Sequence, residues 1–457
     1  MAHQLPVLNS TPGSSALRPD GGRSFIVTAD VIGRYARRRQ LVFAVLLVLY
    51  VLLPWVQLGG HPAVFLDLEH RAFHLFGATF NAQDFWLTFF VLSGIGFVLI
   101  VVTALWGRVW CGYACPQTVF LEGVYRRIER LVEGPRNLRL KRDAGSLSFG
   151  RAGRKLVKHA LFIALSFVVA HVFLSYFVSL PEMFQMMRER PRQHSEAFAW
   201  AATMTLITYG NFAWFREQTC LVLCPYGRLQ SVLTDSDSLV VGYDQERGEP
   251  RGKPQERGAG DCVDCGRCVV VCPTGIDIRN GLQIECIGCS ACADACDAVM
   301  SKLERPTGLI RYDSQNGLAR LAKRFWRPRV YVYAALGLLG LAVATALIAT
   351  RTAFEANLLR LSSAPFLIEA DGKRVRNSLE LHVVNKHGDS RTFRIDGAPG
   401  AGLEYVIGMP VVRLGSLQEL RIPIFVQAPN DHHRRTVRLR IDDGQSPRFV
   451  ETSFIAP

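Results

Sequence analysis

Residues 262–296 decide the fold and read CVDCGRCVVVCPTGIDIRNGLQIECIGCSACADAC. This stretch contains two cysteine runs of one spacing, C-x2-C-x2-C-x3-C, and a proline follows the first run. The other cysteines form two shorter motifs, Cys111-x3-Cys115-Pro116 and Cys220-x3-Cys224-Pro225. All 12 cysteines of the 457-residue chain therefore belong to these four motifs.

The paired longer runs predict two [4Fe–4S] clusters, because three thiolates of each run hold one cluster and the fourth reaches across to the other. The first cluster would take Cys262, Cys265, Cys268 and Cys296, and the second Cys286, Cys289, Cys292 and Cys272. Two four-cysteine zinc sites are the alternative, but zinc ribbons favour separated C-x2-C pairs. Residues 216–329 also contain no histidine for a mixed zinc site. Iron held by four thiolates has no open position, so the predicted chemistry is one-electron transfer. One departure from the pattern is Asp297, which stands where a proline usually follows the last cysteine.

The two C-x3-C-P motifs permit two interpretations. Each begins five residues after an apolar run, Cys111 after Trp106 and Cys220 after Phe215. On a continuous helix the i,i+4 spacing places both sulfurs on one face. The motifs could thus bring four thiolates together as an extra redox or copper site, formed by Cys111, Cys115, Cys220 and Cys224. The alternative is four small buried cysteines, each pair followed by a helix-ending proline.

Five apolar runs contain no Asp, Glu, Lys or Arg, and each approaches the roughly 20 residues that cross a bilayer. They are Leu41–Gln57, Phe85–Trp106, Ala160–Leu180, Ala197–Phe215 and Val330–Thr350. We therefore expect five transmembrane helices, the first kinked near Pro54. The segments before, between and after the first four runs hold 6, 1, 11, 3 and 16 Lys or Arg residues. This alternation predicts a cytoplasmic N-terminus, a cytoplasmic cysteine-rich segment and an external C-terminal region. The net charge of +14 then follows from topology, and we expect no nucleic-acid partner.

The C-terminal region has a different pattern. Leu379, Leu381 and Val383 alternate with polar residues, and two later segments repeat the pattern. Period-two alternation predicts half-buried strands, here roughly seven in an immunoglobulin-like sandwich. The fold class is thus a multidomain membrane protein: a five-span helical bundle, a two-cluster ferredoxin-like insert and an all-β sandwich. The expected domains are an N-terminal segment (1–40), a four-helix membrane region (41–215), a dicluster segment (216–329), a fifth membrane helix (330–350) and the sandwich (351–457).

Three stretches carry a resemblance to a known family. They read WCGYACPQT at 110–118, LVVGYDQERGEPRGK at 239–253 and ECIGCSACADACDAVM at 285–300. With the order of spans, clusters and sandwich, the chain resembles the cytochrome c oxidase accessory protein family CcoG, also called FixG or RdxA. The resemblance implies a polyferredoxin of the bacterial inner membrane whose sandwich is periplasmic. It further implies an oxidoreductase that reduces Cu(II) to Cu(I) during assembly of a cbb3-type cytochrome oxidase. Its partners would be oxidase subunits or copper-delivery factors, with the electron donor left open.

Two other functions remain open. NapH- and NosR-type quinol dehydrogenases resemble this chain in four spans, both C-x3-C-P motifs and the paired ferredoxin runs. The sandwich and the stretch at 239–253 favour the first function over this one. A non-catalytic assembly scaffold is the third hypothesis, and loss of the clusters would distinguish it from the other two.

Overall fold

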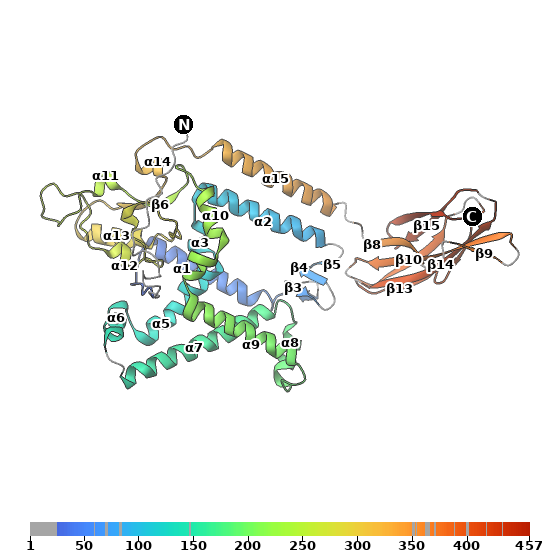
Figure 1. Cartoon of the computed structure of the whole chain (residues 1–457), viewed down its shortest axis with the longest axis horizontal. Helices are drawn as coiled ribbons and strands as arrows, with labels where there is room; N and C mark the ends of the chain where they lie inside the picture. Colours follow the sequence, from blue (N-terminus) through green and yellow to red (C-terminus); the bar gives the residue numbers. More distant parts are fainter. Residues whose placement is uncertain are drawn as a thin grey trace. The chain divides into compact units, whose positions relative to one another are not determined.

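The computed structural model describes residues 25–457 except 59, 69–71, 82–84, 146–147, 350–351, 353, 362–365, 370–371, 388, 399–401, 417 and 432. The chain divides into two compact units (Figure 1). The first comprises Met1–Gln57 with Phe90–Ala342, and the second comprises Leu58–Phe89 with Val343–Pro457.

Each expected apolar run coincides with a long helix. These helices are α1 (Arg34–Leu52), α2 (Phe85–Trp106), α7 (Phe149–Leu174), α9 (Ser195–Tyr209) and α15 (Pro328–Ala349). Within the described residues, three helical stretches have the length and hydropathy of a membrane span: Phe89–Trp106, Phe149–Leu174 and Pro328–Leu347. In contrast, α1 begins inside a cluster of arginines, and α9 gives way to a π-helical segment, η3 (Gly210–Phe215). Spans at α1 and α9 therefore stay predictions.

Several helix boundaries differ from those expected. Helix α1 ends at Leu52, so Pro54 follows the helix and does not kink it. The residue before a proline is biased away from the helical conformation, which explains this early end. Helix α7 begins already at Phe149, where the Ser148 side chain caps it by accepting from the Arg151 N–H. It stops at Leu174, and a separate helix, α8 (Leu180–Arg188), follows.

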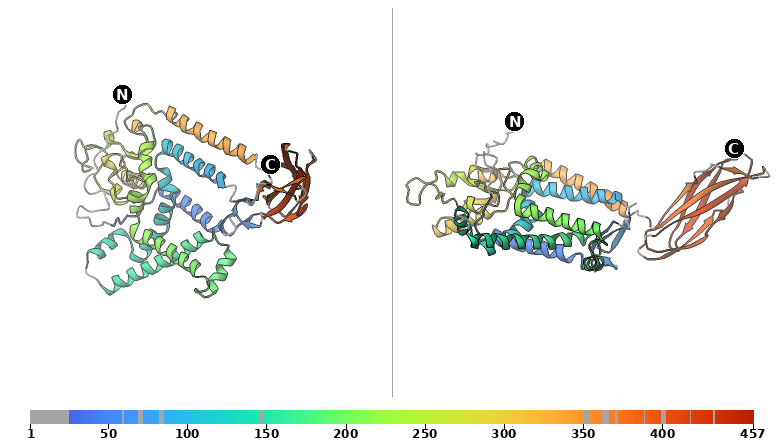
Figure 2. Two further views of the ribbon diagram at one scale, coloured as in Figure 1. Left: turned by 45° about the vertical axis from the view of Figure 1, so that its right-hand side comes forward. Right: turned by 60° about the horizontal axis from the view of Figure 1, so that its bottom comes forward.

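The long helices of the first unit lie alongside one another, as Figure 2 shows, and α7 packs against α9. A mainly aromatic core beside these two helices comprises Phe162 of α7 with Leu121, Tyr125 and Phe212. Tyr125 stacks on Phe212 with ring centroids 4.5 Å apart, and its hydroxyl lies 2.8 Å from the Ser166 hydroxyl. A buried tyrosine usually has such a partner for its hydroxyl.

Short elements join these helices. Between α2 and α7 lie α3 (Val109–Tyr113), α4 (Pro116–Phe120), η2 (Leu121–Tyr125), α5 (Arg126–Glu133) and α6 (Arg136–Ala144). After η3 come η4 (Thr219–Leu223) and α10 (Pro225–Leu233). The cysteine-rich segment then contains α11 (Gln245–Gly248), α12 (Arg267–Val270), η5 (Ile278–Asn280), α13 (Ala291–Lys302) and α14 (Gln315–Leu318). Its one described sheet pairs β6 (Val240–Tyr243) with β7 (Ile310–Asp313) in antiparallel register.

A small antiparallel sheet in the second unit was not expected from the sequence. It comprises β3 (Val64–Asp67), β4 (Ala72–Leu75) and β5 (Ala78–Asn81), and β1 (Gln57–Leu58) pairs with β2 (His61–Pro62) nearby in the chain. The β4–β5 hairpin turns at Phe76-Gly77, where both residues have positive φ. Two-residue hairpin loops favour this backbone conformation because its twist matches that of the strands.

The C-terminal region is a two-sheet antiparallel sandwich, which confirms the predicted immunoglobulin-like fold. One sheet has the order β12-β14-β10-β8 with β9 paired to β10, and the other has the order β13-β11-β15-β16. The first sheet contains β8 (Phe354–Arg360), β9 (Leu367–Ile368), β10 (Arg374–Asn385), β12 (Glu404–Ile407) and β14 (Glu419–Pro429). The second contains β11 (Arg391–Gly397), β13 (Val411–Leu414), β15 (Arg435–Asp442) and β16 (Pro447–Phe454). The described part of the sandwich thus has nine strands where roughly seven were expected.

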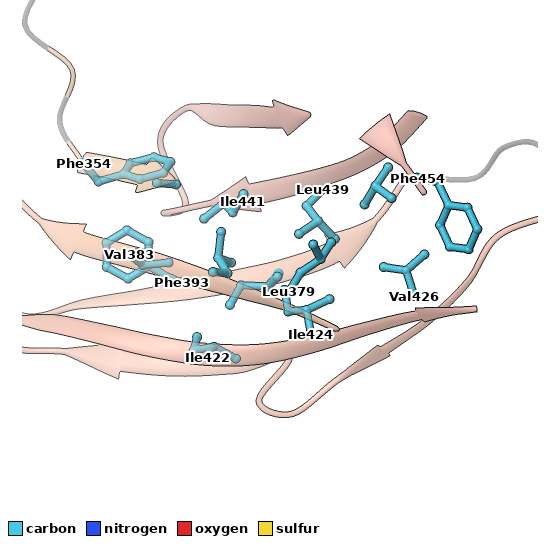
Figure 3. Packing of buried hydrophobic residues seen from close by; sticks show 14 of the residues in the cluster. Phe354, Leu379, Val383, Phe393, Ile422, Ile424, Val426, Leu439, Ile441 and Phe454 are labelled. Carbon is cyan, nitrogen blue, oxygen red and sulfur yellow. The ribbon is translucent and has the colours of Figure 1, made fainter. Parts of the chain in front are cut away.

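Alternate side chains of these strands form the core of the sandwich (Figure 3). Leu379, Leu381 and Val383 of β10 are fully buried, as are Ile422, Ile424 and Val426 of its partner β14. Phe393 and Phe354 meet edge to face at 5.3 Å between ring centroids. The period-two pattern in the sequence therefore corresponds to the buried face of each sheet.

Candidate metal centre

The cysteine-rich segment contains two cavities lined by cysteines. Cys262, Cys265, Cys268 and Cys296 line one of them, which we call the outer cavity because Cys265 is exposed. Cys272, Cys286, Cys289 and Cys292 line the other, which we call the inner cavity, and Cys268 also borders it. The two linings bring together the same two sets of four cysteines that the sequence pattern predicts as cluster ligands.

The two cysteine runs have the same local backbone. In each run, the residues two and four positions after the first cysteine have positive φ: Asp264 and Gly266 in one, Gly288 and Ser290 in the other. Successive turns of this kind direct backbone N–H groups into a concave site that suits an anion. The N–H groups of Gly288 and Ala291 interact with the sulfurs of Cys286 and Cys289. Hydrogen bonds to the sulfurs of this type stabilise and tune iron–sulfur clusters.

Burial dominates the acid–base behaviour of these thiols. It raises the pKa of Cys286 and of Cys296 to about 12, and that of Cys268 to about 11. Thiolates at the buried positions would be costly without a cation, but a metal ion deprotonates the thiols that coordinate it. The donor set therefore fits a metal group and not eight free thiolates.

The spacing of the sulfurs bears on which metal fits. Within the described residues, no three His, Cys, Asp or Glu side chains are placed to share one metal ion. A tetrahedral zinc site requires four such ligands about one ion. In a [4Fe–4S] cluster each thiolate binds a different iron, so the sulfurs stand farther apart. Each cavity instead presents one set of four cysteines, as a [4Fe–4S] cluster requires.

A buried arginine supports an anionic occupant in the inner cavity. Arg39 of α1 is 8% exposed, and its Nε donates to the Gly112 carbonyl at 2.9 Å. Its Nη2 is buried and has no hydrogen-bond partner in the described part of the chain. Its charge acts on Cys289, which lines the inner cavity. A cluster with net negative charge would supply the counter-charge that this guanidinium lacks.

The structure explains why Asp297 can replace the usual proline. Asp297 lies inside α13, the helix that also carries Cys292 and Cys296. A proline inside a helix would remove a backbone hydrogen bond and kink it. The Asp297 carboxylate instead accepts from the Gly308 N–H at 2.8 Å and so connects α13 to the segment that follows it.

The C-x3-C-P motifs do not lie on continuous helices, so that expectation was wrong. Cys111 lies in α3, but Cys115 is an extended residue that precedes Pro116 at the start of α4. Cys220 lies in η4, and Cys224 is likewise extended before Pro225 at the start of α10. The proline ends one helix and begins the next, because it cannot donate within a helix but suits its first turn. The two motifs thus share one backbone plan.

The two motifs nevertheless bring their four thiols together. Cys115 and Cys224 both act electrostatically on Cys111, and all three act on Cys220. Burial raises the pKa of Cys111 to about 11 and that of Cys220 to about 12. The Cys111 thiol also donates to Gln230 Oε1 of α10 at 3.4 Å. We call Cys111, Cys115, Cys220 and Cys224 the thiol group.

A polar clasp holds the two halves of the thiol group together. Gln117 donates to the Arg216 carbonyl at 2.9 Å, and Asn211 donates to Gln117 Oε1 at 2.7 Å. The Thr219 hydroxyl then donates to Asn211 Oδ1 at 2.6 Å. Because Gln117 follows Cys115 and Thr219 precedes Cys220, this chain of hydrogen bonds fixes the spacing of the two motifs.

The thiol group adjoins the inner cavity. A Cβ added to Gly112 would lie 3.0 Å from the backbone nitrogen of Cys289 and 2.8 Å from the Ile287 carbonyl. Cys111 also packs against the core formed around Cys289 and Ile287. Only glycine permits this approach, so Gly112 allows the thiol group to contact the inner cavity.

Hydrogen bonds hold the ferredoxin segment against two of the long helices, α1 and α2. Asp294 of α13 is buried and accepts from the backbone N–H groups of Tyr35 and Ala36 at 3.2 and 2.7 Å. It thereby caps the N-terminus of α1, where a carboxylate is favoured. The Ser238 hydroxyl donates to the Ala104 carbonyl of α2 at 2.7 Å. These contacts fix both cavities relative to α1 and α2.

Sequence reasoning missed the charged residues around this site. In the sequence, Arg39 is one member of a basic cluster that indicates topology. Yet Ala36, Arg39 and Phe43 are spaced i, i+3, i+7 and form the buried face of α1. That helical spacing is the signal that could have singled Arg39 out from Arg37 and Arg38.

Comparison with known proteins agrees with this geometry. A family model described as "4Fe-4S dicluster domain" matches residues 215–315, one described as "4Fe-4S binding domain" matches 87–135, and one described as an "IG-like fold at C-terminal of FixG" matches 344–457. The "Nitrogen fixation protein FixG" of Rhizobium meliloti is 35% identical over 415 residues, which is 81% of this chain and 78% of that protein. "Protein RdxA" of Cereibacter sphaeroides is 33% identical over 449 residues, covering 93% and 95%.

A crystal structure of a FixG-related protein from Vibrio parahaemolyticus matches 23% of this chain and 98% of that one, at 18% identity and a TM-score of 0.21. The curated relatives match most of both chains. The chain is an iron–sulfur electron-transfer protein and belongs to the FixG/RdxA family.

Proposed function

We propose that this protein carries electrons one at a time from the outer cavity through the inner cavity to the thiol group, and there reduces Cu(II) to Cu(I). The observation that carries the proposal is the direct packing of Gly112 and Cys111 against Cys289. A [4Fe–4S] cluster in each cavity would supply the one-electron chemistry. The residues of this chain hold the inner cavity in contact with the thiol group.

Copper is the substrate in this proposal and not a resident cofactor. Each Cu(II) takes up one electron and becomes Cu(I), and no bond to a substrate carbon or oxygen is made or broken. Soft thiolates favour Cu(I), so the thiol group suits the product. Its four sulfurs come from two motifs held together by the Gln117 clasp.

The remaining predictions on topology and partners complete the proposal. All five long helices would span the inner membrane, with the N-terminus and residues 216–329 cytoplasmic and residues 351–457 periplasmic. Cbb3-type oxidase subunits or copper-delivery factors would receive the reduced copper. The family resemblance supports these partners, and the electron donor is left open.

Metal analysis of anaerobically purified protein tests the proposal. About eight iron and eight sulfide per chain are expected if each cavity holds one cubane. Replacing all four cysteines of the thiol group by serine is expected to preserve that iron and abolish Cu(II) reduction by the dithionite-reduced protein. Cys265→Ser is expected to disturb the outer cluster and slow copper reduction. An iron-free yet active preparation would disprove the proposal.

Two further experiments distinguish copper reduction from the other two proposed functions. Reduction of the clusters by a quinol analogue, without copper turnover, would favour a quinol dehydrogenase. Normal oxidase assembly in cells that carry Cys265→Ser together with Cys289→Ser would favour a scaffold that needs no electron transfer.

A further inference from the structure

Two arginines from outside the ferredoxin segment act on cysteines that line the inner cavity. Arg39 belongs to α1, and Arg108 lies between α2 and α3. Both stand where the inner cavity meets the thiol group. Among the described residues, no carboxylate lies within 4.0 Å of either guanidinium to form an ion pair, and both donate to backbone carbonyls. The buried arginines Arg126 and Arg216 of the same unit, in contrast, do form ion pairs.

Arg39 approaches the cavity from the side of Cys289. Its Nε holds the carbonyl of Gly112, the residue that packs on the Cys289 backbone. Its guanidinium lies over the Phe43 ring, 5.1 Å from the centroid, which leaves Nη2 buried. A buried cation without a carboxylate interacts strongly with any negative charge nearby, because little water screens it.

Arg108 approaches from the side of Cys286. Its Nη1 donates to the carbonyls of Ile284 and Cys286, and its Nη2 to the carbonyl of Gly227 in α10. Its charge favours the thiolates of both Cys286 and Cys111. The arginine therefore links the inner cavity, the first C-x3-C-P motif and the helix that follows the second.

Other charged groups also lie near the inner cavity. Arg126 donates to the Pro273 carbonyl at 3.2 Å, beside the cavity residue Cys272, and it pairs with Glu122 and Glu217. Asp294 accepts from backbone N–H groups at the start of α1. Unlike Arg126, Arg39 and Arg108 pair with no carboxylate among the described residues.

The outer cavity has charged side chains of its own. Arg267 and Arg279 line it, and the carboxylates of Asp277 and Asp264 pair with Arg279. Asp297 lies near Cys296 and pairs with Arg34 at 3.8 Å. Reduction adds one negative charge to a cluster, so a buried positive charge beside a cavity favours reduction of the cluster in it.

We propose that Arg39 and Arg108 are redox-tuning residues that raise the reduction potential of the cluster in the inner cavity. That cluster, which lies beside the thiol group, would then hold an electron more strongly than it would without these two charges. The inference rests on the proposed function in requiring a one-electron carrier in the inner cavity. The step adds one electron to that carrier, and no bond forms or breaks.

An anaerobic redox titration with dithionite, followed by EPR, tests the inference on the full-length protein. Arg39→Gln is expected to lower the equilibrium constant for reducing one cluster about tenfold, which is about 59 mV for one electron. The other cluster is expected to keep its potential. Arg39→Lys keeps the charge and is expected to retain most of the wild-type potential.

Arg38→Gln is the matched control, because it removes the same charge from the next position of α1, where the side chain is exposed. It is expected to leave both potentials unchanged, since solvent and salt screen an exposed charge. Arg108→Gln is expected to lower the same potential as Arg39→Gln by a smaller factor. Cys265→Ser, which alters the outer cluster, identifies the signal that belongs to it.

Each outcome decides the inference. Loaded Arg39→Gln protein with both potentials unchanged would overturn it, as would an equal shift in Arg38→Gln. If Arg39→Gln fails to bind its second cluster, Arg108→Gln decides, and an unchanged potential there would overturn the inference. Iron-free wild-type protein would instead overturn the proposed function, and the inference with it.

Discussion

The ferredoxin segment (216–329) and the C-terminal sandwich (351–457) have similar lengths but different cores. The sandwich buries 17 hydrophobic residues in one cluster, and none is a cysteine. The ferredoxin segment has two small clusters that include Cys262, Cys268 and Cys289 themselves. Small domains with too little apolar core need a metal or a disulfide to be stable. The comparison indicates that the sandwich folds by apolar burial, whereas the ferredoxin segment needs its ligands bound.

The first unit and the sandwich also differ in where their ion pairs lie. Glu129 of α5 is 2% exposed and binds Arg216 with two oxygens, at 2.8 and 3.2 Å. Arg139 contacts the same carboxylate at 3.2 Å. Burial alone would raise the pKa of Glu129, but Arg216, Arg139 and Lys158 outweigh it and hold the pKa below its usual range. The ion pairs of the sandwich, in contrast, lie mostly at its surface.

Iron removal is expected to have the largest effect. Anaerobic chelation of the full-length protein should abolish amide protection in α12, α13 and the β6–β7 pair, because metal binding supplies the folding energy of such segments. Protection in β10, β14 and β15 should be unchanged. Hydrogen exchange with mass spectrometry measures both regions in one sample. Equal protection of α13 with and without iron would remove the proposed difference between the two cores.

The second-largest expected effect is the difference in stability lost when a buried and an exposed carboxylate are each neutralised. Glu129→Gln leaves Arg216 and Arg139 without their counter-charge and is expected to cost about 3–5 kcal/mol of stability. The matched change in the sandwich is Glu451→Gln, whose partner Arg438 lies 3.0 Å away, with both side chains about half exposed. That change is expected to cost less than about 1 kcal/mol.

Chemical denaturation in detergent, followed separately for the two regions, measures this pair. The Glu129 variant is expected to lower the midpoint of the first unit alone. Similar small losses for both variants would show that the buried network is solvated and contributes little to stability.

The sequence predicts those features that depend on local spacing. The cysteine intervals alone predict both ligand sets, because a cluster constrains neighbouring residues of one run. Alternation in Leu379–Val383 predicts β10 and its buried face, since a strand repeats every two residues. Apolar length predicts the long helices, although their ends are displaced where Pro54 and Ser148 act.

The unpredicted features depend on contacts between distant residues. The helices are interrupted at Cys115 and at Cys224 because the proline after each cysteine occupies the first turn of a new helix. The spacing of the cysteines does not predict whether that proline lies inside a helix or at its start. The fit of Gly112 onto Cys289 joins residues 177 positions apart in the chain, so no sequence window contains it. Arg39 resembles its neighbours in the sequence because burial, and not residue type, distinguishes it.

The smallest expected effect is a response of the sandwich to acid. The Asp443 side chain is fully buried, and its Oδ1 accepts from the Ser446 and Gln445 N–H groups at 2.8 and 2.9 Å. Burial alone would raise its pKa, but these donors and His387, 2.9 Å from Oδ2, outweigh it and lower the pKa below the usual range. The stabilisation is therefore complete above the unfolded value near ~3.9 and is lost as the pH falls through the folded pKa.

Asp443→Asn keeps an oxygen for the two N–H groups but removes the charge that faces His387. It is expected to cost about 1–2 kcal/mol at pH 7. The difference from wild type at pH ~7 should be narrower at pH ~3, because the wild-type carboxylate begins to gain a proton only below the unfolded pKa. Hydrogen exchange of β10, β11 and β15 at both pH values measures it. A difference that stays constant with pH would mean that the Asn change acts through packing and not through the charge of Asp443.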